Sequence, residues 1–385
     1  MLALLGLFSL FLSNATACRR FLPEERLAAA GYTIFGTTII ISLIHTGASR
    51  EAVGDLDTLL RPLWAILLLI LFIRVKIHES VLWYGLACGA IVAGTNAIYE
   101  FISASHYIRA SGATSANTYG NLALIMGFLS AMGCYYFLGR GRSQLVIPAI
   151  ALILGLIASI LSGSRGSWLV IPILGLCLLA TYWQSSYRRH AITGIAIIAV
   201  MTLVLVLVPQ TGVIDRVNEA VSNFKLYLAD PIAHGDTSVG QRLELWRAAW
   251  QMFLEKPILG GGIGHSFNDF LLEGIAAGQY HPATSVQTMP HNILLDTLAI
   301  RGLVGLTGLA TLLGVLLYIF YQAARHKDKD LHHLGMAGMS LIIAYFVYGF
   351  TDSPMEYGAP LVFFSFYTAL ITYLLAQRKY MLEFK

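Results

Sequence analysis

Long apolar runs separated by short polar connections are the feature that most restricts how this chain can fold. The longer runs have about 17–20 residues, enough for a helix to cross a hydrocarbon core of roughly 30 Å. The composition agrees, since 57% of the residues are hydrophobic and only 12% are charged, whereas soluble domains carry about 25% charged residues. A membrane barrel would need alternating segments, which these runs are not. The sequence therefore predicts an all-α polytopic membrane protein with about 11–12 transmembrane helices. The expected spans are 1–13 (short), 29–46, 62–74, 81–100, 119–138, 145–162, 166–183, 190–208, 302–321, 334–350 and 360–376.

The charges of the connections predict how the chain is threaded. Lysines and arginines cluster in alternate connections, which under the positive-inside rule face the cytoplasm and place the C-terminus there. The net charge of +4 comes from these residues and does not indicate nucleic-acid binding. None of the four cysteines lies in an outward connection, so no disulfide is expected. The opposite, outward connections instead carry Arg50, Arg61, Arg109 and Arg165.

One outward connection is far longer than the others. It divides the chain into three expected parts: the first eight spans over 1–208, a loop with interfacial helices over 209–301, and the C-terminal spans over 302–385. The loop retains several aromatic residues and shows helical periodicity, so we expect it to be folded. Long loops in compact proteins are commonly functional.

Inside this loop the segment 238–257 predicts a helix. Ser238 and Gln241 have the spacing of a capping box, tryptophans and leucines recur at helical spacing, and Pro257 ends the pattern. The helix lies either in the membrane interface or against the bundle, and the pattern is compatible with both. The "GGGIG" run at 260–264 predicts a sharp turn with positive φ angles rather than a nucleotide site.

Three arginines near the outward face are candidates for binding an anion. Arg165 lies in the tight turn "SGSRGS" between two spans, and Arg242 lies in the first turn of the capped helix, whose N-terminus itself favours anions. A guanidinium suits two-point contact with phosphate oxygens. Arg247 is a weaker candidate for substrate binding, and Arg301 is expected to anchor the chain at the interface.

His291, in "TMPHNILLD", is the candidate general base. Pro290 is placed to open a short helix with His291 in its first turn, where the positive helix end favours a neutral imidazole. His265 and His281, from the same loop, are candidate substrate contacts. Asp296 lies five residues further on and is not expected to pair with His291.

A metal site is not expected. The chain has no HExxH motif and no cysteine–histidine pair at zinc spacing. Asp55 and Asp57 in the first outward connection resemble paired metal ligands, but two nearby aspartates are common. Four carboxylates remain at the outward face without a defined role: Asp296, Glu244, Asp352 and Glu356.

Together these segments resemble the O-antigen ligase and O-antigen polymerase superfamily. The resemblance rests on "SGSRGSW" at the end of a span, "GQRLELWRAAW" and "KPILGGGIGHSF" in the long loop, and "PHNILLDTLAIRGLVGL" after it. It covers about 160–310 and includes the order of these motifs.

The resemblance implies an O-antigen ligase in the bacterial inner membrane. Such an enzyme moves a glycan from a polyprenyl-diphosphate carrier to the lipid A–core at the periplasmic face, without cofactor or metal. Arg165 and Arg242 would stabilise the diphosphate leaving group, and His291 would deprotonate the acceptor hydroxyl in a displacement that inverts the anomeric carbon.

Two alternatives within the superfamily stay open. An O-antigen polymerase would use a second lipid-linked repeat as acceptor, and a protein O-oligosaccharyltransferase would use a protein hydroxyl. A single long loop before "PHN" favours the ligase. A secondary transporter is less favoured, because the sequence shows no internal repeat and its polar residues gather at one face.

Overall fold

The computed structural model describes residues 19–47, 61–103, 109–183, 213–264, 266–355 and 358–383, together with isolated residues between 185 and 199. Over these residues the chain is built from helices, and no strand occurs among them. In chain order the elements are α2 (Pro23–Thr46), η2 (Arg61–Leu63), α4 (Trp64–Val75), α5 (Ser80–Ser103), α6 (Ala116–Met132), α7 (Cys134–Leu138), η3 (Arg142–Leu145), α8 (Val146–Leu161), α9 (Arg165–Trp168), α10 (Val170–Tyr182), α12 (Val213–Ala229), α13 (Pro231–His234), α14 (Ser238–Glu255), α15 (Ser266–Ala276), η5 (Pro282–Thr284), α16 (Ile293–Ala324), α17 (Lys329–Tyr348) and α18 (Gly358–Glu383).

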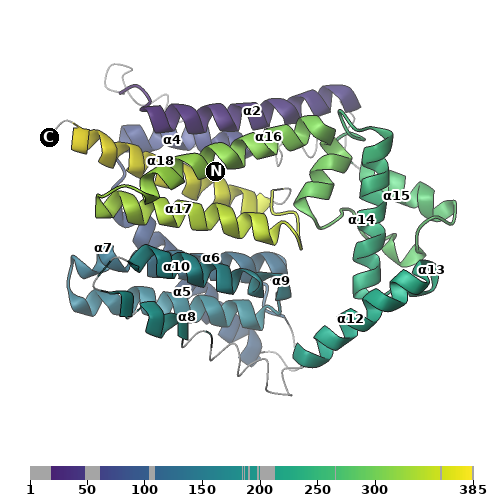
Figure 1. Ribbon diagram of the computed structural model, residues 1–385, viewed down its shortest axis with the longest axis horizontal. Helices are drawn as coiled ribbons and strands as arrows, with labels where there is room; N and C mark the ends of the chain where they lie inside the picture. The colour runs from purple at the N-terminus through teal and green to yellow at the C-terminus, as the bar shows by residue number, and fades with distance from the viewer. Residues whose placement is uncertain are drawn as a thin grey trace.

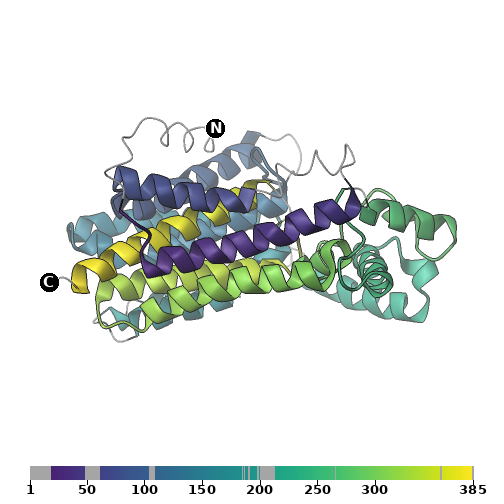
Figure 2. The same cartoon turned by 90° about the horizontal axis from the view of Figure 1, so that it is seen from above.

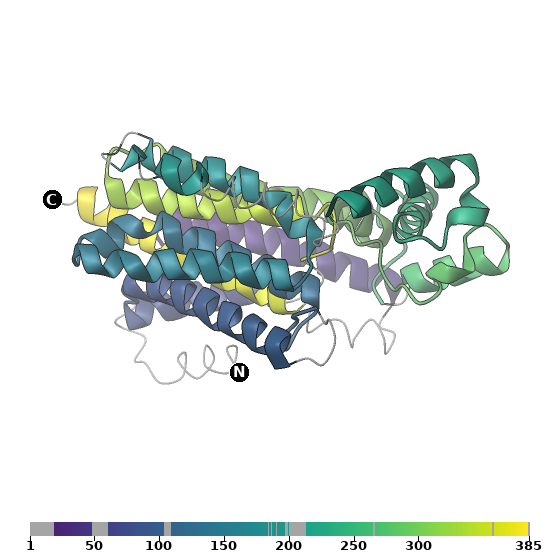
Figure 3. The same cartoon turned by 90° about the horizontal axis from the view of Figure 1, so that it is seen from below.

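Most of the helices run side by side in one bundle, and α12–α15 project from one end of it (Figure 1, Figure 2 and Figure 3). We call this end of the bundle the loop end. Six helical stretches in the described part of the chain are long and apolar enough to cross a membrane. They are α2, α5, the η3–α8 stretch, α16, α17 and α18. The prediction of an all-α polytopic membrane protein is therefore confirmed. The expected span at 1–13 lies outside the described residues, and the one at 190–208 is described only in part.

Close helix contacts in the bundle depend on small residues. A Cβ on Gly155 of α8 would lie 2.6 Å from the carbonyl oxygen of Ala123 and 3.2 Å from the Cα of Gly127, both on α6. The two backbones therefore touch, as is common where helices associate by close packing within lipid. Larger buried side chains fill the centre of the bundle, among them Trp83, Tyr345 and Phe364.

The long helix α16 is interrupted at Gly302, whose φ of 60° is not helical. The residues on either side of Gly302 form hydrogen bonds with the glycine-rich turn after α14. Ala299 O accepts from Gly261 N at 2.7 Å, and Leu303 N donates to Pro257 O at 2.8 Å. The turn has positive φ at 260, 262 and 264, as the sequence predicts. The interruption falls at the predicted boundary between loop and C-terminal spans.

Two local expectations are wrong. The N-cap of α14 is Thr237, whose hydroxyl accepts from Gly240 N at 2.9 Å, so the cap lies one residue before Ser238. The side chain of Gln241 donates to Asp236 O instead of completing a capping box. Arg301 is not an interfacial anchor, because it is 2% exposed and its guanidinium lies 5.6 Å from the Phe35 ring centroid.

The sequence left open whether α14 lies in the membrane interface or against the bundle. In the structure one of its faces packs against the bundle. Leu245, Ala248, Ala249 and Met252 are buried and pack in one cluster with Ala299 of α16. Trp250 and Leu254, on another face of the helix, are 48% and 59% exposed. The helix therefore docks on the bundle through this buried face and leaves an apolar edge uncovered in the structure.

We expect replacement of Gly155 by leucine to destabilise the protein. The added side chain must separate α8 from α6, and overpacking of this kind costs about 1–3 kcal/mol. Thermal unfolding in detergent should show a lower Tm for Gly155→Leu. The matched control is Gly175→Leu on α10, where the nearest neighbour of an added Cβ is a side-chain atom of Ile195 at 3.9 Å. Equal Tm values for the two variants would contradict this account of the α6–α8 contact.

Candidate active site

A cavity of about 300 Å³ opens at the loop end of the bundle. It lies where the starts of α6 and α14, the turn between α8 and α9, and the segment after α17 meet. Its lining is polar and holds two guanidinium groups and one carboxylate: Arg109, Asn117, Asn121, Gly163, Ser164, Gly166, Ser238, Arg242, Thr351 and Asp352. We call it the polar cavity.

Arg109 is fixed in place by two short hydrogen bonds. Its Nε donates to Ser162 O at 2.7 Å, and its Nη2 donates to the side-chain oxygen of Asn117 at 2.7 Å. The following residue, Ala110, donates its backbone N–H to Leu161 O at 3.1 Å. A guanidinium has five N–H donors, so these contacts hold Arg109 at the cavity wall and leave it donors for a bound anion.

Arg242 reaches the same cavity from the N-terminal part of α14, one turn after Ser238. Its side chain is exposed, and Ser238 also lines the cavity. The N-terminal N–H groups of α14 add positive potential here. Arg242 therefore enters the polar cavity from residues 213–290, which we call the loop segment, and its role in binding an anion stays a prediction.

The backbone of the turn before α9 forms the third side of the cavity. Arg165 opens α9, and its neighbours Ser164 and Gly166 line the cavity. The hydroxyl of Ser164 lies 3.1 Å from the side-chain oxygen of Asn121 on α6. A Cβ on Gly166 would collide with Thr351, so the absence of a side chain allows the turn to close against the segment after α17.

His291 does not lie in the first turn of a helix, contrary to the expectation. Helix α16 begins at Ile293, and Asn292 is its N-cap, accepting from Leu294 N and Leu295 N at 3.1 and 3.2 Å. His291 precedes the cap with a φ of 53°, a left-handed conformation that non-glycine residues seldom adopt. Such strain is concentrated at functional sites.

The imidazole of His291 is held between two side chains. Its Nδ1 lies 3.5 Å from Asp352 Oδ1, and its Nε2 lies 3.3 Å from Gln287 Oε1. Asp352 is almost buried, accepts from Ser353 N at 2.9 Å, and lines the polar cavity. His291 therefore reaches the polar cavity through Asp352, which lines it together with Arg242.

Two of these residues have little signal in the sequence. Asp352 follows a span in "GFTDSPM" and was one of several carboxylates without a role, while Arg109 appeared only as one of the arginines in the outward connections. Both are charged residues near the end of a span, where an ionisable side chain costs free energy unless it has a partner or a function. That position is the signal by which the sequence could have indicated them.

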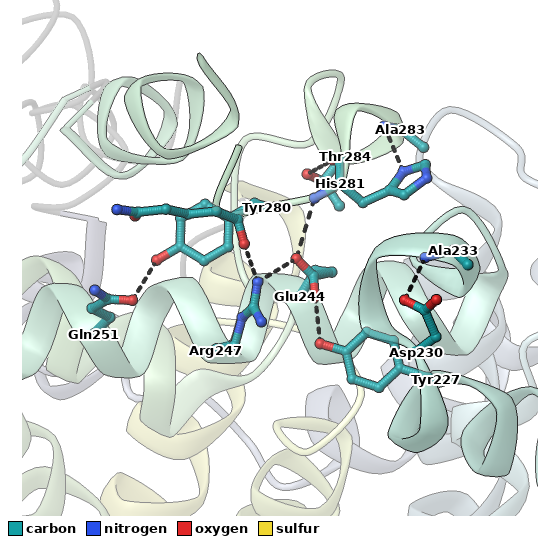
Figure 4. A network of polar contacts seen from close by, with 11 residues as sticks. Tyr227, Asp230, Ala233, Glu244, Arg247, Gln251, Tyr280, His281, Ala283 and Thr284 are labelled. Atoms are coloured by element: carbon teal, nitrogen blue, oxygen red, sulfur yellow. Dashed lines mark hydrogen bonds and ion pairs between the residues drawn. The ribbon is translucent and has the colours of Figure 1, made fainter. Parts of the chain in front are cut away.

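Arg247 and His281 lie away from the polar cavity, in a network that holds the loop segment together (Figure 4). At its centre is the buried carboxylate of Glu244, which pairs with Arg247 at 3.0 Å and accepts from His281 N at 3.2 Å. The hydroxyl of Tyr227 also donates to Glu244. Burial and the adjacent Glu244 carboxylate raise the pKa of Tyr227, so its hydroxyl remains a donor. The ring of His281 accepts from Ala283 N at 3.0 Å.

Among the remaining candidates, Asp352 is the one that the structure brings into the site. His265, Asp55, Asp57 and Glu356 lie outside the described residues, so substrate contact by His265 stays a prediction. Asp296 is buried in α16 and Asp352 is the carboxylate next to His291. Among the residues the structure describes, no three histidine, cysteine, aspartate or glutamate side chains are grouped to hold a metal ion.

Comparison with known proteins gives this site a context. Residues 150–310 match a family model described as O-Antigen ligase. The O-antigen ligase of Escherichia coli is 21% identical over 268 residues, which cover 68% of this chain and 61% of that ligase. These matches confirm the resemblance to the O-antigen ligase superfamily. An uncharacterized protein of Haemophilus influenzae is 24% identical over 345 residues, 89% of this chain and 85% of that protein.

The similarity to the O-antigen ligase superfamily lies in the part of the chain that carries most of the candidate site. The matched region contains Arg165, Arg242 and His291. Arg109 and Asp352 lie on either side of it, and the fold brings them to the same cavity.

We expect Glu244→Ala to loosen the loop segment. The change removes the acceptor shared by Tyr227, Arg247 and the backbone of His281, and leaving buried donors unsatisfied costs about 1–3 kcal/mol. Limited proteolysis should cut within 213–290 faster in this variant, and Tm should fall. Glu273→Gln on the exposed side of α15 is the matched control and should behave as wild type. A Glu244→Ala protein with wild-type protease resistance would show that the network does not hold the segment.

Proposed function

We propose that the protein is an inner-membrane glycosyltransferase of the O-antigen ligase type. It would move a glycan from a polyprenyl-diphosphate carrier to the lipid A–core, with the loop end of the bundle facing the periplasm. The observation that supports this most is the polar cavity, where two guanidinium groups lie beside a carboxylate that contacts His291. The named E. coli relative is an O-antigen ligase, which favours that acceptor.

In this proposal the arginines bind the diphosphate of the donor. Arg109 and Arg242 approach from different sides of the cavity and suit an anion with several oxygens. The position of Arg165, at the start of α9 between Ser164 and Gly166, is consistent with a third contact. Negative charge grows on the diphosphate as the glycosidic bond breaks, so these groups stabilise the transition state more than the ground state.

His291 would act as the general base. With the Nδ1 proton directed at Asp352, the Nε2 atom is the basic nitrogen, and the side chain of Gln287, whose Oε1 lies 3.3 Å from Nε2, would have to turn away to admit the acceptor hydroxyl. The acceptor hydroxyl gives its proton to Nε2 as its oxygen forms a bond to the anomeric carbon. The bond from that carbon to the phosphate oxygen breaks, and its electron pair leaves with the diphosphate. One direct displacement of this kind inverts the anomeric configuration.

We assign no direct contact with the diphosphate to Arg247 and His281. Both are engaged in the Glu244 network, and we propose that they act on substrate binding only by keeping α14, and with it Arg242, in position.

The test is reconstitution in liposomes with a polyprenyl-diphosphate glycan and three acceptors: lipid A–core, a second lipid-linked glycan and a protein with free hydroxyls. Transfer to lipid A–core that survives EDTA is the expected result. Transfer only to the second lipid-linked glycan would overturn the ligase proposal in favour of a polymerase. Loss of transfer on chelation would overturn the metal-independent mechanism and return attention to Asp55 and Asp57.

We expect His291→Gln to lower the rate of transfer by about 10²–10⁴-fold, the usual contribution of a general base. Asp352→Asn should give a smaller loss, since it removes only the group that orients the ring. Donor binding should persist in both variants. His234→Gln, in the same loop segment but outside the cavity, is the control. Near-normal transfer by His291→Gln would exclude the general-base role.

Arg242→Gln should lower kcat by about 10²–10³-fold, as loss of one donor to a developing anion does. Arg242→Lys should recover part of this loss, because it restores the charge without the two-point geometry. Lys225→Gln removes a charge from exposed α12 and controls for long-range electrostatics. An equal effect of Arg242→Gln and Lys225→Gln would show that Arg242 acts only through net charge.

A further inference from the structure

Glu100 is the only charged residue of α5, a helix that is otherwise apolar or neutral and long enough to cross a membrane. Its position in the last turn of that helix is costly for two reasons. An ionisable side chain in a membrane span costs free energy, and the carbonyl end of a helix disfavours negative charge. A carboxylate at such a position is expected to have a partner or a function.

The partners of Glu100 are three N–H donors. Ser111 N donates to Oε2 at 2.9 Å and Gly112 N donates to Oε1 at 3.0 Å. The side chain of Asn96, one turn earlier on α5, also donates to Oε1, at 2.7 Å. Two consecutive backbone N–H groups that converge on one anion form a nest, and hydrogen bonds to a carboxylate are stronger than those between neutral groups. The carboxylate therefore ties the backbone at 111–112 to the end of α5.

The bound backbone belongs to a short connection, 109–112, that carries Arg109. We call these four residues the Arg109 hook. Its other side is tied to the end of α8, where Ala110 N donates to Leu161 O at 3.1 Å and Arg109 Nε donates to Ser162 O at 2.7 Å. The hook is therefore clamped between α5 and α8, with the Glu100 carboxylate as the clamp on the α5 side.

Helix α6 closes the third side of the hook. Gly112 has a φ of 54°, and a Cβ there would lie 2.8 Å from a ring carbon of Tyr119 on α6. Only glycine combines this backbone conformation with so close a ring. The path of the hook is thus fixed on three sides, and it ends at the wall of the polar cavity, which Arg109 lines.

We propose that Glu100 is a positioning residue for the diphosphate of the donor. By holding the Arg109 hook, it would fix the place from which the Arg109 guanidinium contacts the anion. This inference rests on the proposed function and names a residue outside the cavity on which its anion site depends. Among the described residues that line the polar cavity Glu100 is not included, so it acts through Arg109 and not by contact with the substrate.

The test is a double-mutant cycle of Glu100→Gln and Arg109→Gln, read out as kcat/KM for glycan transfer in liposomes. An amide has one oxygen and one NH2 group, so one of the two backbone donors loses its acceptor in Glu100→Gln. Displacement of a positioning group by about 1 Å can cost about 10²-fold, and we expect a loss of about tenfold to 10²-fold. In the Arg109→Gln background the same change should cause no further loss, because changes that act through one group are not additive.

A purely structural role of Glu100 gives a different result. It would lower Tm and transfer by the same factor in both backgrounds, and that outcome would overturn the proposal. Two matched controls should transfer like the wild type. Glu219→Gln removes the same charge from the exposed surface of α12, and Thr95→Val changes an exposed side chain of α5 whose hydroxyl donates to Ile91 O within the helix.

Gly112→Ala displaces the hook without changing the carboxylate, and it keeps the test open if Glu100→Gln folds poorly. The added methyl group must push the hook away from Tyr119. Transfer should fall in the wild-type background and remain unchanged in the Arg109→Gln background. Wild-type transfer by both Glu100→Gln and Gly112→Ala would show that the position of the hook does not matter.

Binding of inorganic pyrophosphate to the full chain in nanodiscs separates this inference from the proposed function. Glu100→Gln and Arg109→Gln should weaken binding, while His291→Gln should bind pyrophosphate like the wild type and lose transfer. Weaker binding by Arg109→Gln together with wild-type binding by Glu100→Gln would reject the role of Glu100 and keep the anion site. A wild-type protein that neither binds pyrophosphate nor transfers a glycan would reject both.

Discussion

The loop segment is held on the bundle by a contact between two stretches of backbone, and each stretch requires a glycine. The turn after α14 and the interruption of α16 exchange backbone hydrogen bonds, with Gly262 N donating to Ile300 O at 2.9 Å and Val304 N donating to Ile258 O at 3.1 Å. A Cβ on Gly260 or on Gly302 would collide with the opposite backbone. Both residues also have positive φ, so glycine is required for conformation as well as for space. The position of Arg242 over the bundle depends on this junction.

The junction also explains why charged groups from distant parts of the chain meet in one cavity. Arg242 comes from a helix that lies on the end of the bundle, Arg109 from the connection before α6, and Asp352 from the end of α17. None of these three positions lies within one of the candidate membrane spans. Ionisable side chains are costly in lipid, and in the proposed function a site at the loop end would meet water next to the acyl chains. A reaction between a lipid-anchored donor and a hydroxyl acceptor needs that combination.

The sequence predicts the parts of this structure that depend on local patterns. Hydropathy locates most spans, and helical spacing with Pro257 locates α14, although its cap is Thr237 rather than Ser238. The backbone at His291 was not predictable, because its left-handed conformation follows from the docking of Ile293 N onto Gly349 O at 2.7 Å. Asp352 and Arg109 were missed as site residues because their contacts are also with distant parts of the chain. Their partners lie 61 and 53 residues away, at His291 and Ser162, and only the packed bundle brings them together.

The central claim is that the polar cavity holds the diphosphate of a lipid-linked donor beside His291. The most direct measurement is a structure of His291→Gln in nanodiscs with a bound polyprenyl-diphosphate glycan. The account predicts diphosphate density in contact with Arg109 and Arg242, with the anomeric carbon on the His291 side of the cavity. Diphosphate density bound elsewhere, with the polar cavity filled by water, would contradict it.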